Sequence, residues 1–132
     1  MLAAAGAFGG FSTNDIGAAE RFYGESLGLD VERMGDGGMG EMMFVTHPDG
    51  GRTFIYEKDD HQPATFTVLN FVVDDIDAAA AGLREAGVTL EQLEWTGEDG
   101  IARDPEGRMP STLWFKDPAG NWIGVLDEPP EA

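Results

Sequence analysis

The sequence of 132 residues contains no cysteine. This absence excludes disulfide scaffolds, thiol nucleophiles, iron–sulfur clusters and cysteine zinc sites. Basic residues are scarce, with 8 lysines and arginines against 25 acidic residues, and the net charge is −17. Binding to nucleic acid requires cationic groups that displace counterions from the phosphates. We therefore expect no nucleic-acid partner and no binding to anionic membranes.

Long apolar runs are also missing from the sequence. No run approaches the ~20 residues that span a bilayer. The first ten residues are small and apolar but lack a basic stretch, so we expect no secretory signal and a cytoplasmic location. What is present is a hydrophobic content of 42% and an aromatic content of 10%, which predict a folded chain with a core. The acidic excess indicates either a well-solvated surface or a field that concentrates cationic ligands.

An internal duplication organises the chain. With a shift of 60, a first unit repeats in the pairs Phe11/Phe71, Asp15/Asp75, Ile16/Ile76 and Ala19/Ala79. With a shift of 70, a second unit repeats in the pairs Pro48/Pro118, Gly50/Gly120, Ile55/Val125 and Glu57/Asp127. Each half therefore begins and ends with the same unit. We expect the ten additional residues of the second half in the loop 96–110.

Each half reads as strand, helix and three strands. Asp15 and Asp75 stand at helix N-cap positions, and Gly28 and Gly87 follow as helix stops. Alternating or short apolar runs predict strands at 11–13, 40–46 and 52–57 in the first half and at 69–73, 89–95, 112–115 and 122–126 in the second. The stretch 35–38 is expected to be a hairpin turn. We expect one domain over 1–132, with a first module at about 6–57, a linker at 58–63 and a second module at about 64–127.

The motifs carry a family resemblance over residues 8–126. The early segment Asn14-Asp-Ile, with Phe22-Tyr and Leu27-Gly-Leu, and the late segment Trp114-Phe-Lys-Asp-Pro-Ala-Gly-Asn-Trp122 resemble the glyoxalase/bleomycin resistance protein/dioxygenase superfamily, also called vicinal oxygen chelate proteins. The resemblance implies an α+β fold in which two βαβββ modules form a cupped, eight-stranded mixed sheet around a central cavity. It also implies a homodimer.

Metal-dependent relatives hold a divalent ion with one residue from the first and last strand of each module. The resemblance assigns these positions to Phe8, Phe54, Val68 and Gly124, whose side chains carry no donor atom, whereas such a site needs three or four N, O or S donors. We therefore expect no metal and no cofactor. His61, beside Asp59 and Asp60, offers donors for an ion, but we interpret it as part of a solvated linker.

Other catalytic arrangements are not indicated. His47 precedes a Pro-Asp-Gly turn, and none of Ser12, Ser26 and Ser111 has a partner histidine at a recognisable spacing. We therefore assign no catalytic residue. The loop 98–110 carries Arg103 and Arg108 among acidic residues, and we interpret it as a mobile, solvated loop, with a role as a lid as the alternative.

Alternation along the strands adds further residues to the expected cavity lining. The candidate ligand-binding residues are Phe8, Ser12, Arg52, Phe54, Tyr56, Val68, Asn70, Trp114, Trp122 and Gly124. Of the adjacent pair Trp114 and Phe115, one side chain must face the cavity and the other the helix. Gly10 and Gly124 favour an open cavity, because they leave volume unfilled. The alternative is that the aromatic residues fill the cup as a core.

These residues predict a metal-independent small-molecule-binding protein, because apolar walls with few polar groups are typical of ligand pockets. The resemblance to drug-sequestering bleomycin-resistance members implies that the protein sequesters its ligand, and the negative charge favours a cationic aromatic compound. One alternative is a metal-dependent lyase, isomerase or dioxygenase of the same superfamily with non-standard ligands. Such an enzyme would need either a metal held by unexpected residues or acid–base work by His61, Glu57 or Asp59. Another is an inert partner module within a larger assembly. The partners that we expect are a small molecule and a second copy of the chain.

Overall fold

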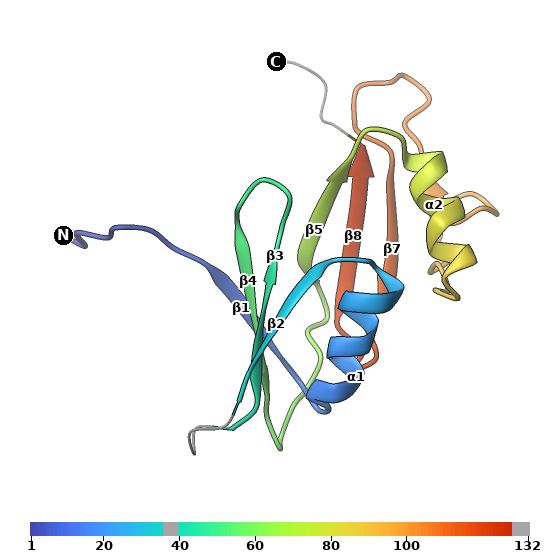
Figure 1. Cartoon of the computed structure of the whole chain (residues 1–132). Coiled ribbons are helices and arrows are strands. Elements are labelled where there is room, and N and C mark those ends of the chain that lie inside the picture. The colour runs from blue at the N-terminus through green and yellow to red at the C-terminus, as the bar shows by residue number, and fades with distance from the viewer. Residues whose placement is uncertain (36–39, 128–132) are drawn as a thin grey trace. The chain divides into compact units, whose positions relative to one another are not determined.

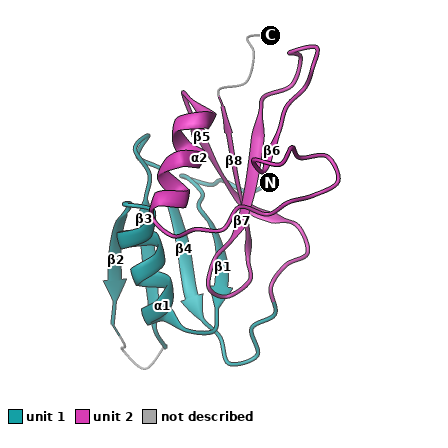
Figure 2. Ribbon diagram, turned by 90° about the vertical axis from the view of Figure 1, so that its right-hand side faces the viewer, with its two compact units in different colours: residues 1–62 teal, residues 63–132 magenta. Residues whose placement is uncertain are grey.

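The computed structural model describes residues 1–35 and 40–127. The chain divides into two compact units, unit 1 (Met1–Gln62) and unit 2 (Pro63–Ala132), which Figure 2 colours separately. Each unit contains one half of the duplicated sequence, and each has the expected order of one strand, a helix and three strands. Of the turn expected at 35–38, residues 36–38 lie outside the described residues. None of the helices in the described ranges is long and apolar enough to cross a membrane.

Unit 1 is a four-stranded mixed sheet with one helical segment (Figure 1). Its elements are β1 (Gly9–Thr13), α1 (Ile16–Arg21), the π-helical turn η1 (Phe22–Ser26), β2 (Asp30–Met34), β3 (Met42–Thr46) and β4 (Arg52–Glu57). The strand order is β1-β4-β3-β2, with β1 parallel to β4 and the other neighbours antiparallel. The chain therefore crosses over through the helix to form its one parallel pair.

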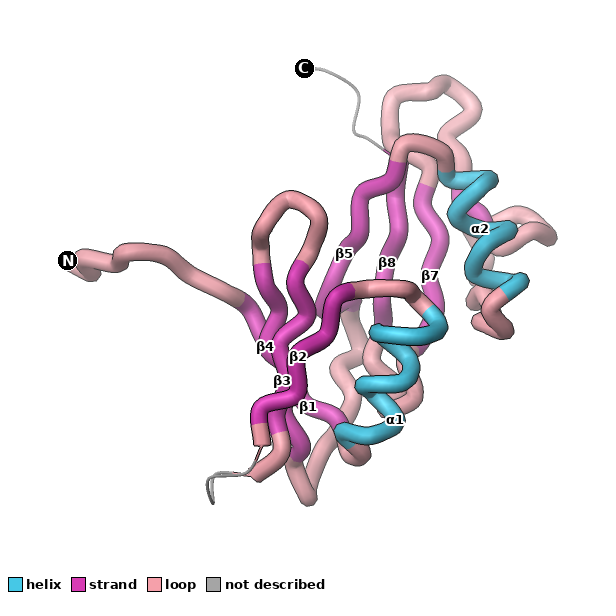
Figure 3. Tube along the Cα trace, viewed as in Figure 1, coloured by secondary structure: helices cyan, strands magenta, loops and turns pink. Residues whose placement is uncertain are grey.

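Unit 2 repeats this topology. Figure 3 shows its strands β5, β8 and β7 side by side, with α2 next to them. Its elements are β5 (Thr67–Val73), α2 (Ile76–Glu85), β6 (Ile101–Ala102), β7 (Thr112–Lys116) and β8 (Trp122–Asp127). The strand order is β5-β8-β7-β6, and β5 runs parallel to β8. The prediction of an α+β fold made of two βαβββ modules is confirmed, with the strands arranged as one four-stranded mixed sheet in each unit.

The predicted helix signals act as expected. The side chain of Asp15 accepts a hydrogen bond from the Ala18 amide, and Asp75 accepts one from the Ala78 amide, each at 3.1 Å. These bonds satisfy amides that the first helical turn leaves without an intrahelical partner. Gly28 follows the first helical segment with a φ of 71°. A residue with a side chain rarely adopts this conformation, so glycine ends the helix there.

Each helix covers one face of its own sheet, and the core lies between them. In unit 1, the side chains of Met43, Val45 and Ile55 are fully buried. In unit 2, Leu113, Phe115 and Ile123 are fully buried, and the neighbouring positions on the same strands are more accessible. This alternation leaves the opposite side of each sheet uncovered by the helix of its own unit, and we call that side the open face.

Two strand predictions are wrong. Three strands were expected after the first helix but only two were located, and the edge strand β2 was missed because Asp30, Glu32 and Arg33 break the apolar alternation by which strands are recognised. At a sheet edge such charged side chains stay in solvent, where Arg33 pairs with Glu20 and Glu41 at 3.1 and 2.9 Å. Conversely, residues 89–95 form no strand, although the Glu91 amide donates to the carbonyl oxygen of Trp114.

The additional residues of the second half lie mainly between α2 and β6. In unit 1, Arg33 pairs with Met43 and stands 18 residues after the capping Asp15. In unit 2, Ile101 pairs with Leu113, the equivalent of Met43, and stands 26 residues after Asp75. Eight of the ten residues therefore precede β6, whereas the expected loop 96–110 contains β6 and extends beyond it.

Candidate functional site

The candidate ligand-binding residues fall into two groups of five, one in each unit. In unit 1, the open face of β4 is made by alternate residues, because Thr53 and Ile55 point into the core while Phe54 and Tyr56 remain half-buried. The group there is Phe8, Ser12, Arg52, Phe54 and Tyr56. The group in unit 2 is Val68, Asn70, Trp114, Trp122 and Gly124.

An aromatic cluster covers the open face of unit 1. The rings of Phe8 and Phe44 lie 5.4 Å apart, those of Phe44 and Phe54 5.2 Å, and those of Phe54 and Tyr56 5.5 Å in a stacked pair. The Arg52 guanidinium lies 4.4 Å from the centroid of the Phe44 ring, within the range of a cation–π contact. Phe44 was missed in the sequence, although it alternates with the buried Met43 and Val45 and pairs with Phe54.

A shallow depression of about 550 Å³ adjoins this cluster, and its lining is Gly6, Ala7, Phe8, Gly50, Gly51 and Arg52. The turn beside it places Gly50 at a φ of 93°, and the Gly51 amide donates to the Asp49 carboxylate at 2.9 Å. Three of these six lining residues are glycines, which have no side chain. The depression therefore offers few side chains that could recognise a ligand.

Ser12 and His61 form a pair that the sequence analysis excluded. The Ser12 hydroxyl oxygen and His61 Nδ1 are 2.6 Å apart, so the expectation that no serine has a partner histidine is wrong for Ser12. They are 49 residues apart in the chain. The parallel neighbours β1 and β4 end on the same side of the sheet, and the segment after β4 turns back there, with the Lys58 amide donating to the Thr13 carbonyl at 3.0 Å. The pair ties the predicted linker to β1.

Unit 2 holds a cleft of about 410 Å³ with an aromatic lining. Its walls are Thr65, Phe66, Thr67, Leu93, Trp95, Trp114 and Trp122. The rings of Trp95 and Trp114 meet edge to face, with centroids 6.2 Å apart. All three tryptophans of the sequence line this cleft. Phe115 is fully buried in the core, so of the adjacent pair it is Trp114 that reaches the open face.

One wall of the cleft comes from the additional residues of the second half. Leu93 and Trp95 lie in the segment between α2 and β6, and the sequence analysis did not assign them to the site. Two hydrogen bonds hold the backbone of this segment. The Glu91 amide donates to the Trp114 carbonyl at 2.8 Å, and the Leu93 amide donates to the Thr96 hydroxyl at 2.9 Å. The insertion therefore gives unit 2 an aromatic wall that has no counterpart in the repeat of unit 1.

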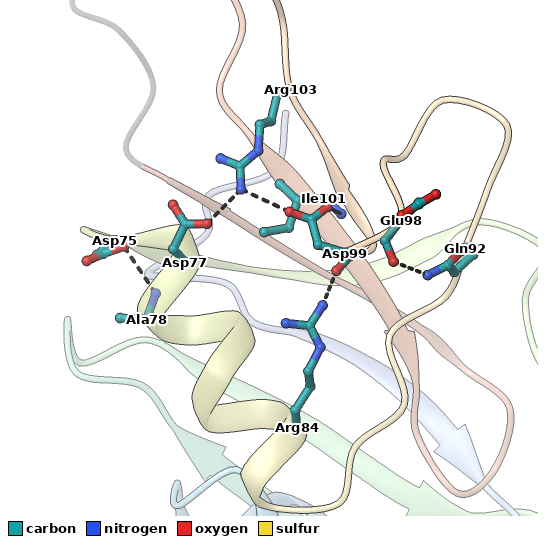
Figure 4. Close-up of polar contacts among 9 residues, drawn as sticks. All are labelled: Asp75, Asp77, Ala78, Arg84, Gln92, Glu98, Asp99, Ile101 and Arg103. Atoms are coloured by element: carbon teal, nitrogen blue, oxygen red, sulfur yellow. Dashed lines mark hydrogen bonds and ion pairs between the residues drawn. The ribbon is translucent and has the colours of Figure 1, made fainter.

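The loop that follows is anchored to α2 (Figure 4). Arg84 donates to the Asp99 carbonyl, and Arg103 pairs with Asp77 at 2.6 Å and with Asp99 at 3.2 Å. The Ile101 amide and the Arg103 guanidinium hold the pKa of Asp99 below its ordinary value, while Asp77 and Asp99 raise that of Arg103. The loop is exposed as expected, but polar contacts bind this part of it to the helix.

Gly10 and Gly124 do not leave open volume, which corrects the expectation that they do. A Cβ atom at Gly10 would lie 2.9 Å from the carbonyl oxygen of Phe54. A Cβ atom at Gly124 would collide with the side-chain oxygen of Asn70, the residue that pairs with it across the sheet. Both glycines therefore allow a neighbouring strand or side chain to approach closely.

The remaining candidates of unit 2 do not line the aromatic cleft. Asn70 occupies the space above Gly124, and Val68 lies where the register between β5 and β8 shifts. The cleft therefore contains two of the five residues predicted in this unit, Trp114 and Trp122.

The residues at the family's metal positions do not fit a metal. Phe54 lies against Phe8, with ring centroids 6.3 Å apart, and Gly124 lies beside Asn70. Neither Phe8, Phe54, Val68 nor Gly124 supplies a donor atom to an ion. Within residues 1–35 and 40–127, no three histidine, aspartate or glutamate side chains converge as a metal site would require.

Comparison with solved structures supports the fold. The chain is 26% identical to TnmS3, an antibiotic binding protein from Streptomyces sp. CB03234, with a TM-score of 0.70 and coverage of 96% of this chain and 98% of that one. A superfamily member from Sphaerobacter thermophilus DSM 20745 is also 26% identical, with a TM-score of 0.71 and coverage of 96% and 100%. A glyoxalase/bleomycin resistance protein from Streptomyces sp. CB03234 is 28% identical, with a TM-score of 0.61 and coverage of 91% and 99%.

No curated protein matches the chain. The family model, in contrast, matches residues 9–125, which include both βαβββ units from β1 into β8. The chain therefore belongs to the Glyoxalase/Bleomycin resistance protein/Dioxygenase superfamily.

Proposed function

We propose that this protein binds a small cationic aromatic compound without the help of a metal ion and sequesters it. The observation that carries the proposal is the aromatic cleft of unit 2, where Trp95, Trp114 and Trp122 gather with Phe66 around about 410 Å³. A cleft of this size and composition is typical of sites for small organic ligands. The flat rings offer stacking surfaces to an aromatic ligand.

Metal independence follows from the chemistry of the four positions where relatives hold their ion. Two are phenylalanines, one is valine and one is glycine, and none of these side chains coordinates a divalent cation. A lyase or dioxygenase that works through such an ion would need another donor set. The protein is therefore expected to bind its ligand by packing and cation–π contacts rather than by coordination.

A positive charge on the ligand is supported by two features. The net charge of −17 attracts cations from a distance. In addition, the aromatic rings of the open faces already hold positive groups: Arg52 lies over Phe44, and the Lys116 ammonium lies 4.8 Å from the centroid of Trp122. Aromatic rings that make cation–π contacts with the protein's own side chains are suited to make the same contacts with a positive group of a ligand.

One of the comparisons supports a binding function. TnmS3, which covers nearly the same length of chain at 26% identity, is an antibiotic binding protein. Transfer of this activity to the present chain is a proposal, since one fold serves many functions. We further propose that the two units belong to one domain and that the protein acts as a homodimer; the cytoplasmic location stays a prediction from the sequence.

Three probes of one shape test the proposal. Benzyltrimethylammonium, its uncharged isostere neopentylbenzene and the anion benzylsulfonate share a phenyl ring and a tetrahedral head group. Because all three tryptophans line the cleft, any change in tryptophan emission reports on that site. We expect the cation to change the emission and to raise the melting temperature most, and the anion least. Binding of the neutral or anionic probe alone would contradict the proposed ligand charge.

Elemental analysis tests metal independence. The protein is incubated with Zn²⁺, Fe²⁺, Mn²⁺ and Ni²⁺, desalted and assayed for retained metal. We expect less than one ion per chain for each metal, with unchanged binding of the cationic probe. A stoichiometric ion that survives desalting and is required for binding would favour the metal-dependent alternative.

Light scattering at two salt concentrations tests the dimer. Surface charges are screened beyond about 10 Å at 0.1 M salt, so self-repulsion between two acidic chains weakens as salt rises. We expect a dimer that dissociates more readily at low salt. A mass of 14.2 kDa at both concentrations would contradict the proposal.

A further inference from the structure

Lys116 and Trp122 occupy facing positions on neighbouring strands of unit 2. The register pairs Lys116 of β7 with Trp122 of β8, and both positions belong to the open face because Phe115 and Ile123 point into the core. The ammonium lies 4.8 Å from the centroid of the Trp122 ring. This contact follows from the strand register.

Lys116 is a cation held against a wall of the aromatic cleft. Trp122 lines the cleft, and the described residues that line it include no carboxylate. The second partner of Lys116 is Glu91, whose carboxylate is 3.6 Å from the ammonium. Glu91 begins the segment that carries Leu93 and Trp95 into the cleft wall, since its amide donates to the Trp114 carbonyl. Lys116 therefore divides its interactions between the cleft and the segment that borders it.

We propose that Lys116 is an internal competitor of the ligand's positive group. In the free protein its ammonium occupies the electron-rich face of the Trp122 ring, and this contact sets the selectivity of the cleft for charged ligands. The inference rests on the proposed function and names a residue that tunes it. A positive ligand group that approaches Trp122 meets the repulsion of Lys116 and must share or displace its contact with the ring. Glu91 then retains Lys116, so the lysine keeps a partner when the ring is taken.

The competitor also explains how a strongly acidic protein can discriminate among cations. Long-range attraction by the net charge favours any cation, because it depends on charge and distance alone. At the ring, in contrast, a ligand must outcompete a primary ammonium that is already in place. Alkylated ammonium groups fulfil this condition, because aromatic walls recognise them and they lose less hydration than a primary ammonium.

Calorimetric titration of the full chain with benzyltrimethylammonium and neopentylbenzene tests the inference. The test variant is Lys116→Gln, which removes the ammonium. Lys116→Arg keeps a cation on the ring and serves as the conservative variant. Arg108→Gln removes one positive charge elsewhere in unit 2, since Arg108 is exposed and pairs with Glu106 at 3.2 Å. This control separates the local competitor from the change in net charge.

We expect Lys116→Gln to bind benzyltrimethylammonium about three- to tenfold more tightly than the wild type, the range given by one surface cation–π contact and one removed repulsion. The affinity for neopentylbenzene should change less than twofold, and Lys116→Arg and Arg108→Gln should match the wild type. The inference would be overturned if Lys116→Gln gained affinity equally for both probes, or if it bound the cation no more tightly than Arg108→Gln does. Either result would leave the proposed function intact. If the wild-type protein binds neither probe, the proposed function fails and the inference with it.

An NMR measurement on the wild-type protein gives a second readout. The ε-methylene protons of Lys116 should be shifted upfield by the Trp122 ring in the free protein. Saturation with benzyltrimethylammonium should move them toward their ordinary position, whereas neopentylbenzene should not. An unchanged Lys116 signal at saturation with the cation would contradict competition at the ring.

Discussion

The indole rings of Trp95 and Trp114 meet edge to face at 87°, with their centroids 6.2 Å apart. Trp114 stands on β7, where the strand register fixes its position opposite Gly124. Trp95 stands on the segment between α2 and β6, which the first module lacks in this length. The contact joins a rigid strand to an inserted loop and gives the cleft of unit 2 two perpendicular walls.

Trp95→Ala should weaken the binding of benzyltrimethylammonium with little change in stability. The side chain is 63% exposed, so its removal leaves the core intact. Loss of one aromatic contact corresponds to about 1 kcal/mol, or roughly fivefold in affinity. The measurement is titration by calorimetry together with a thermal melt. Met109→Ala, which truncates a side chain 68% exposed and outside the cleft, is the matched control. Equal binding by Trp95→Ala and Met109→Ala would show that Trp95 takes no part in the site.

Gly124→Ala should destabilise the protein by about 1–3 kcal/mol, because the new methyl group collides with the Asn70 side chain. Urea unfolding measures the loss. The double variant Asn70→Ala/Gly124→Ala should recover part of it, since the shorter side chain at position 70 frees the space. Gly82→Ala is the control, because a Cβ there meets nothing within 4 Å and lies in α2, where alanine is favoured by about 1 kcal/mol. A Gly124→Ala variant as stable as the wild type would contradict the close approach.

Asp117→Ala should cost about 2 kcal/mol or more in the free energy of unfolding. The carboxylate is 5% exposed and accepts hydrogen bonds from the amides of Ala119 and Asn121 and from the Asn121 side chain, at 2.9–3.0 Å. Its removal takes away three hydrogen bonds from buried donors. Asp117→Asn, which retains one acceptor oxygen, should lose less. Chemical denaturation of both variants checks the order, and equal stability of wild type and Asp117→Ala would refute it.

The turn after Asp104 should weaken in acid. The Glu106 amide, followed by those of Arg108 and Met109, donates to the Asp104 carboxylate and lowers its pKa below the ordinary value, while desolvation opposes this effect. Because the pKa of Asp104 is lower in the folded protein, its hydrogen bonds contribute fully to stability above the ordinary carboxyl pKa of about 3.9. This contribution to stability is lost as the pH falls through the pKa of the folded protein. NMR titration of the Asp104 carboxyl and of the Met109 amide, whose own side chain does not titrate, measures this loss. Asp104→Asn should remove the pH dependence at Met109, and its persistence there would contradict the assignment.

Much of the fold could be predicted because its signals are local. Asp15 and Asp75 cap the helices at the predicted positions, and the strand predicted at 52–57 coincides with β4. Capping and alternation depend on neighbours within a few residues, so the sequence reveals them directly. The duplication follows from the same local patterns, and the family model confirms the resemblance that they carry.

Other features arise only from contacts between distant residues. Ser12 and His61 are brought together by the parallel pairing of β1 with β4, and the space at Gly10 and Gly124 is taken by Phe54 and Asn70 from neighbouring strands. No local pattern indicates which volume a neighbour will fill.

The sequence by itself determined the two βαβββ modules, the absence of donor atoms at the four metal positions and the open-face location of Trp122, whereas the burial of Phe115 in the structure placed Trp114 on that face. Tertiary structure decided where the ligand-binding surface of unit 2 lies, because Trp95 enters it from an inserted segment that has neither helical nor strand periodicity. It also decided that Lys116 rests on Trp122, since strand register, which is set by packing of the whole sheet, chooses the partner across each pair.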